Sequence, residues 1–122
     1  MERLEEFVLE GKSFIYFDMS EVSKNHEFHK IAEDFKKEMV KYLPNSLYTI
    51  TNVRGVRFDS ETKAYMADYM AFNKPYVRYG AVIGFDSIKK AMGNKICKMV
   101  GRPSMYYALS KELAIEWLLK QD

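Results

Sequence analysis

The sequence predicts an α/β domain: a mainly parallel sheet of four or five strands flanked by about four helices. Strand-like and helix-like segments alternate along the chain, which is typical of a parallel sheet covered by helices. Apolar residues make up 48% and aromatic residues 15% of the 122 residues, enough for a packed core. No linker, low-complexity tract or long repeat divides the chain, so residues 1–122 are expected to form one domain.

The first half of the chain predicts two strands, a helix and a third strand. Residues 13–19 are rich in aromatic and β-branched residues, and residues 7–12 before them predict a short strand with a hairpin turn at Gly11. Apolar residues recur at helical spacing from about Asn25 to Tyr42, and Pro44 ends that helix. A core strand is expected over residues 47–53.

The second half continues the alternation. Asp59 or Ser60 is placed to cap a helix that runs to about Phe72. A strand over residues 77–83 leads into a helix that ends near Val100, where Gly101 suits a helix C-terminus. Residues 105–108 predict a short last strand, and a final helix begins at about residue 110.

Charge and cysteine content narrow the class of protein. The formal net charge of +2 gives no strong field, so no nucleic-acid partner is expected. Cys97 is the single cysteine, which allows no internal disulfide and fits a reducing compartment. The acidic start lacks the features of a signal peptide, and no apolar stretch is long enough to span a membrane. The expected location is the cytoplasm.

Recognisable catalytic motifs are absent from the sequence. There is no glycine-rich phosphate loop, no nucleophile elbow and no cysteine pair, so no enzyme activity and no cofactor are expected. His26 and His29 are three residues apart, but a closed metal site needs further ligands, and we expect no metal here. Asp18 ends a strand where α/β sheets often place ligands, or it begins a turn with Ser20.

The tripeptide Phe-Asp-Ser occurs twice, at residues 58–60 and 85–87, each time where a strand leads into a helix. One interpretation explains both copies: the Asp or Ser caps the helix while the Phe is buried beside it. A second interpretation concerns the first copy only. The hydroxyl of Ser60 at an exposed helix N-terminus is a candidate phosphoacceptor, because the helix dipole tolerates a phosphoryl group.

The helix after Ser60 is apolar almost all round. Its three alanines form a stripe suited to close packing, which leaves larger side chains to cover other faces. Either neighbouring helices bury these larger side chains, or they form a contact surface for a protein partner or a second copy. The residues of this candidate interface are Tyr65, Met66, Tyr69 and Met70.

The third predicted helix is rich in lysine, and Arg102 follows the glycine at its end. No acidic residue occurs between Lys89 and Arg102. Such an amphipathic helix either packs on the core with a solvated lysine face or contacts anionic lipid or an acidic partner. The candidate anion-contact residues are Lys89, Lys90, Lys95, Lys98 and Arg102.

The order of elements and the run from Asn52 to Ser60 (NVRGVRFDS) resemble the STAS domains, which include the anti-sigma-factor antagonists. The resemblance implies a STAS-like fold, with Ser60 as the phosphoacceptor and Asp59 as its neighbour. Three segments, residues 73–77, 81–84 and 101–102, are similar to a bacterial group labelled STAS/SEC14-like, and the SEC14 side implies a lipid pocket. Two functions follow as expectations: a regulatory or protein-interaction module with a phosphorylation switch, or a domain that binds lipid or another small apolar molecule.

Overall fold

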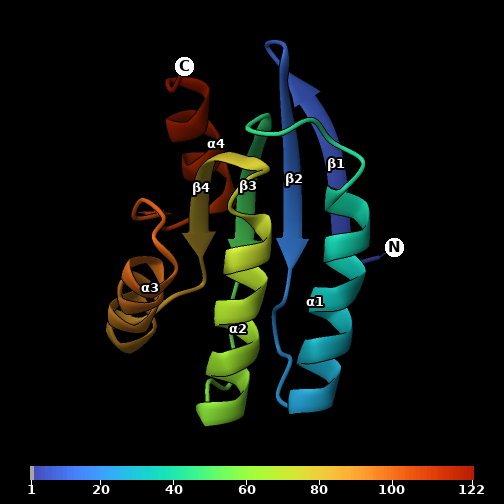
Figure 1. Cartoon of the computed structure of the whole chain (residues 1–122). Coiled ribbons are helices and arrows are strands. Elements are labelled where there is room, and N and C mark those ends of the chain that lie inside the picture. Colours follow the sequence, from blue (N-terminus) through green and yellow to red (C-terminus); the bar gives the residue numbers. More distant parts are fainter. Residues whose placement is uncertain (1) are drawn as a thin grey trace.

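The computed structural model describes residues 2–122, which form a five-stranded sheet with helices on both faces (Figure 1). The strands are β1 (Leu4–Leu9), β2 (Lys12–Asp18), β3 (Leu47–Asn52), β4 (Val77–Ile83) and β5 (Tyr106–Tyr107). The helices are α1 (Asn25–Met39), α2 (Ser60–Asn73), α3 (Ser87–Val100) and α4 (Lys111–Leu119). The predicted fold class is confirmed. The first helix ends at Met39 rather than Tyr42, because the chain tightens into bonds between residues three apart.

The strands lie in the sheet in their order along the chain, from β1 to β5. β1 is antiparallel to β2, joined by a turn in which Glu10 and Gly11 both have positive φ, as a tight hairpin requires. The other neighbouring strands are parallel. Since parallel crossovers are right-handed, adding each strand on the same side places α1, α2 and α3 on one face, and α4 covers the other (Figure 1).

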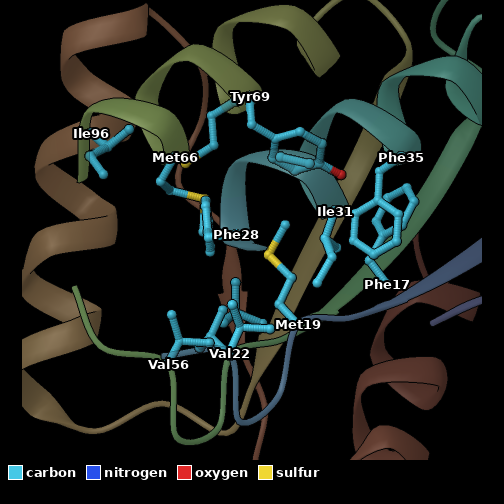
Figure 2. Close-up of a cluster of buried hydrophobic side chains, with 14 of the residues drawn as sticks. Phe17, Met19, Val22, Phe28, Ile31, Phe35, Val56, Met66, Tyr69 and Ile96 are labelled. Carbon is cyan, nitrogen blue, oxygen red and sulfur yellow. The ribbon is translucent and has the colours of Figure 1, made fainter. Parts of the chain in front are cut away.

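The larger core lies between the sheet and helices α1, α2 and α3. The ring of Phe17 on β2 lies 4.4 Å from that of Phe35 on α1 and 6.1 Å from that of Tyr69 on α2, centroid to centroid. All three side chains are buried, and Figure 2 shows Phe17 and Phe35 side by side with Tyr69 reaching towards them. Aromatic contacts therefore join the sheet to both helices.

A row of aromatic rings crosses the opposite face of the sheet. β1, β2, β3 and β4 each contribute one ring, and α4 contributes the last. Successive ring centroids lie 5.1, 5.6, 5.9 and 6.1 Å apart in the series Phe7, Phe14, Tyr48, Tyr79 and Trp117.

Phe35 tests the importance of the larger core. Its side chain has no exposed surface, so Phe35→Ala is expected to lower the free energy of unfolding by about 3–5 kcal/mol, through lost burial and the cavity left behind. Urea unfolding followed by circular dichroism measures the change. Leu43→Ala is the control, because 77% of Leu43 is exposed. Equal stability of wild type and Phe35→Ala would contradict the packing described.

Candidate functional site

Ser60 is the first residue of α2, and its side chain is exposed. Asp59 caps the helix, since its Oδ1 accepts the main-chain N–H of Thr62 at 2.9 Å. Asp86 caps α3 in the same way through the N–H of Lys89 at 2.8 Å. The capping interpretation is therefore confirmed for both Phe-Asp-Ser copies, with Asp as the cap. The hydroxyl of Ser60 is not used as a cap, and its phosphorylation stays a prediction.

The N-terminus of α2 is fastened to that of α1. The buried hydroxyl of Thr62 donates to Oδ1 of Asn25 at 2.6 Å, and Nδ2 of Asn25 donates to Glu61 at 2.8 Å. Glu61 also accepts the hydroxyl of Tyr65 at 2.9 Å, which raises the pKa of that phenol. The carboxylate of Glu61, the acidic group that follows Ser60 in sequence, is thereby held by α1 and Tyr65.

The candidate interface on α2 is wrong for three of its four residues. Met66, Tyr69 and Met70 are only 7%, 2% and 3% exposed, because α2 lies between α1 and α3 (Figure 1) and turns these side chains into the core. Figure 2 shows Met66 and Tyr69 in this position. Tyr65 is half-buried and stacks on the ring of His29 at 4.4 Å. The three alanines of α2 were expected to pack closely against a neighbouring element. This expectation is wrong for Ala64 and Ala71, which are exposed.

A groove of about 400 Å³ separates α2 from α3, and we call it the α2–α3 groove. Small and apolar side chains form most of its surface, and each helix contributes one exposed lysine. Its lining residues are Lys63, Ala64, Ala67, Ala91, Met92, Lys95, Ile96 and Met99. The spacing of alanines on α2 was the only signal of this groove in the sequence.

Two of the five predicted anion-contact residues bind the protein itself. Nζ of Lys89 donates to the main-chain oxygen of Val53 at 3.0 Å. Nη1 of Arg102 donates to the main-chain oxygen of Met70 at 3.3 Å and to Oδ1 of Asn73. Burial lowers the pKa of the Arg102 guanidinium. Lys89 and Arg102 therefore do not share an exposed lysine face with the other three candidates.

The other three candidate cations are exposed on α3. Nζ of Lys90 lies 5.4 Å from the ring centroid of Tyr107, while Lys95 borders the α2–α3 groove and Lys98 lies one turn further on. Their contact with an anion stays a prediction.

A small cavity of about 40 Å³ lies between the sheet, α2 and α3. Its walls are mainly apolar, but Thr49, Thr51, Tyr69 and Asn73 line it with polar groups and are all buried. The hydroxyl of Tyr69 has no hydrogen-bond partner in the described part of the chain, and burial raises the pKa of this phenol. The cavity has room for a few water molecules, which would satisfy that hydroxyl.

Within residues 2–122, no group of three or more His, Cys, Asp and Glu side chains is placed to hold a metal ion. Nε2 of His29 lies 4.0 Å from Glu33, and His26 is exposed. Asp18 uses its carboxylate locally, accepting both the N–H and the hydroxyl of Ser20, which supports the turn interpretation. None of the described helices is both long and apolar enough to cross a membrane.

No family model and no curated protein sequence matches this chain. Among solved structures, the chain is similar to the crystal structure of an uncharacterized protein of the DUF3478 family, with a SpoIIAA-like fold, from Shewanella loihica PV-4. The TM-score is 0.69 at 8% sequence identity, and the alignment covers 94% of this chain and 91% of that chain. An identity this low establishes the shared fold alone.

The chain has a SpoIIAA-like fold, which is the fold of the STAS and anti-sigma-factor-antagonist class. The resemblance expected from the run Asn52 to Ser60 is confirmed at the level of the fold.

The burial of Tyr69 leads to two opposite expectations for its variants. Tyr69→Phe should change the free energy of unfolding by less than about 0.5 kcal/mol, because the lost hydroxyl has no protein partner. Tyr69→Asp should prevent folding, because it buries an unpaired charge. Urea unfolding measures the first variant, and circular dichroism the second. A well-folded Tyr69→Asp protein would contradict the buried position.

The cap at Asp59 makes stability depend on pH. The hydrogen bond that the Asp59 carboxylate accepts from the Thr62 N–H lowers the pKa of this carboxyl. The contribution of this carboxylate to the free energy of unfolding is therefore complete above the ordinary Asp pKa, and it is lost as the pH falls through the lowered pKa. Asp59→Asn retains a good cap without the titration. The stability advantage of wild type over Asp59→Asn should therefore shrink between about pH 5 and pH 2. A difference that is constant over this range would contradict the assignment.

Proposed function

We propose that this protein is a non-catalytic regulatory module that binds a protein partner through the α2–α3 groove. The observation that carries the proposal is the groove itself. It has a volume of about 400 Å³, its walls are mainly apolar, and it remains open between two helices. Met99, on its α3 wall, is 68% exposed. Apolar side chains of a partner that fill such a groove would contribute most of the binding free energy. Contacts at the rim of the groove would supply the rest of the buried interface area. The single cysteine, Cys97, is free and buried, which suits a reducing compartment. We therefore expect the protein to act in the cytoplasm.

The charges around the groove favour an acidic partner segment. Lys63 and Lys95 stand on its two walls, and neither takes part in an ion pair among residues 2–122. The acidic residue in the middle of α2, Asp68, pairs with Lys36 of α1 at 2.5 Å and so belongs to the opposite side of the helix. A segment that combines apolar side chains with Asp or Glu is complementary to this surface.

Ser60 lies one helical turn before Lys63, which lines the groove, and is the proposed switch. A phosphoryl group there adds a charge of about −1.5 to −2. It would be stabilised by the helix N-terminus and would attract Lys63, three residues further along α2. The same charge repels an acidic partner. We therefore propose that phosphorylation of Ser60 releases the partner.

Site-specific crosslinking tests the groove. A benzophenone residue in place of Met99 should crosslink to one partner in the protein's own cells, at a segment rich in acidic and apolar residues, and the same residue in place of exposed Leu43 should not. Lys63→Glu with Lys95→Glu should reduce the product at least about tenfold, the equivalent of 1.4 kcal/mol. Lys24→Glu with Lys37→Glu makes the same charge change elsewhere and is the control. Equal loss in both pairs, or equal crosslinking at positions 43 and 99, would contradict the proposal.

Intact-mass spectra of the protein from its own cells test the switch. The added mass of one phosphoryl group, mapped to Ser60 and absent in Ser60→Ala, is the expected result. Ser60→Glu should reduce crosslinking from position 99, while Ser60→Ala should leave it unchanged. Undiminished crosslinking in Ser60→Glu would argue against release by charge.

The second candidate function is the binding of a lipid or another small apolar molecule, as the SEC14-like resemblance implies. The observation that favours it is the cavity beneath α3 with the unpartnered Tyr69 hydroxyl. A ligand larger than a few waters requires α3 to move outwards. α3 is lightly held, since only Ile96 and Cys97 of its residues are buried.

Paired native and denaturing mass spectra test this second function. A bound molecule adds mass that disappears on denaturation. Thr49→Val with Thr51→Val removes two hydroxyls from the cavity wall at nearly constant shape, and should abolish the added mass if the ligand has a polar end in the cavity. No added mass in wild-type protein would leave water as the occupant.

A further inference from the structure

Three cations meet at a second cavity, far from Ser60 along α2 and distinct from the α2–α3 groove. This basic cavity of about 90 Å³ lies at the start of β4, beside the C-terminus of α2 and the loop after α3. Its charged and hydroxyl-bearing lining residues are Lys74, Arg78, Arg102, Ser104 and Tyr79. Its lining includes no acidic side chain.

Arg102 is half-buried and has only neutral partners in the described chain. One of its terminal nitrogens donates to Met70 and Asn73, and no carboxylate of residues 2–122 forms an ion pair with it. Nη2 lies against Gly80, where an added Cβ would come within 3.6 Å of it and within 3.2 Å of Oγ1 of Thr49. Burying even part of a guanidinium without a counter-charge costs free energy, so an anion is the expected complement.

The other charges near the basic cavity compensate its cations only in part. Nζ of Lys74 lies 3.4 Å from the main-chain oxygen of Val100, so it faces the partial negative charge of the α3 C-terminus. Nε of Arg78 donates to the main-chain oxygen of Asp122. The Asp122 carboxylate accepts the Tyr79 hydroxyl at 2.9 Å, and its pKa is lowered mainly by that bond and also by Arg78.

We propose that the basic cavity binds a phosphate group. A guanidinium fork, two further cations and a serine hydroxyl match the several oxygens of a phosphate better than the two of a carboxylate. The volume accommodates several waters and hence a tetrahedral oxyanion. Because Lys74 and Arg78 are exposed, the phosphate is reached from solvent. It belongs either to a free phosphate ester or to a lipid headgroup.

An NMR titration of the full chain with inorganic phosphate tests the proposal. The amide signals of Arg78, Arg102 and Ser104 should shift together with one dissociation constant. Lys74→Gln with Arg78→Gln should weaken binding about tenfold or more, while Lys95→Gln with Lys98→Gln, an equal charge loss outside the cavity, should change it less than about twofold. Shifts scattered over all lysines, or equal weakening in both pairs, would overturn the site.

Two further arms identify the source of the phosphate. Glycerol 3-phosphate should compete with inorganic phosphate if the ligand is a free ester. Vesicles that contain phosphatidic acid, but not phosphatidylcholine alone, should bind in a way that depends on Lys74 and Arg78 if the ligand is a lipid headgroup. Failure of both arms would overturn the proposal. The groove variant Lys63→Glu with Lys95→Glu should retain phosphate binding, so this result is separate from the fate of the α2–α3 groove.

Discussion

The position of α2 between two other helices determines most of what is distinctive about this protein. Each parallel strand is added on the same side of the sheet, and crossovers of one hand then place three helices on one face. α2 is the middle one, so its bulky side chains pack down and towards α1, where Tyr69 meets Phe17 and Phe35. Its alanines are left facing outwards and towards α3. Small side chains on that flank leave the space that forms the α2–α3 groove, and the cavity beneath α3 follows from the light packing of α3 against the same helix.

The two ends of α2 are held differently, and each end has a distinct chemical character. At its N-terminus, Asn25 and Thr62 join it to α1, and Asp59 satisfies the first turn. The exposed hydroxyl of Ser60 is thus presented on a rigid element. At the C-terminus of α2, the guanidinium of Arg102 donates hydrogen bonds to Met70 and Asn73 in the last turn. One helix therefore connects the proposed phosphorylation site with the proposed phosphate-binding cavity.

The sequence was sufficient for the fold but only partly for the sites. Strand and helix periods, a cap from Asp or Ser in each Phe-Asp-Ser copy and the alternation of elements depend on local residue order, and the structure confirms them. The burial of Met66, Tyr69 and Met70 depended on which neighbours α2 acquires, and no local pattern contains that information. Arg102 lay in a basic run with the lysines of α3, yet it turns inwards because Gly80 leaves room against β4. The resemblance to STAS domains supplied the architecture that periodicity alone left open.

Strand order has a consequence for how the chain is made. Every strand pairs with the one synthesised just before it, so each new strand and helix can add to structure that already exists. Contacts between segments that are near each other in sequence also form quickly. α4 is the exception: it packs across β3 and β4, and near its end the Lys12 ammonium binds the main-chain oxygen of Leu119. The row of aromatic rings on that face of the sheet thus stays uncovered until α4 has been made, so among the described elements α4 is the last to be added.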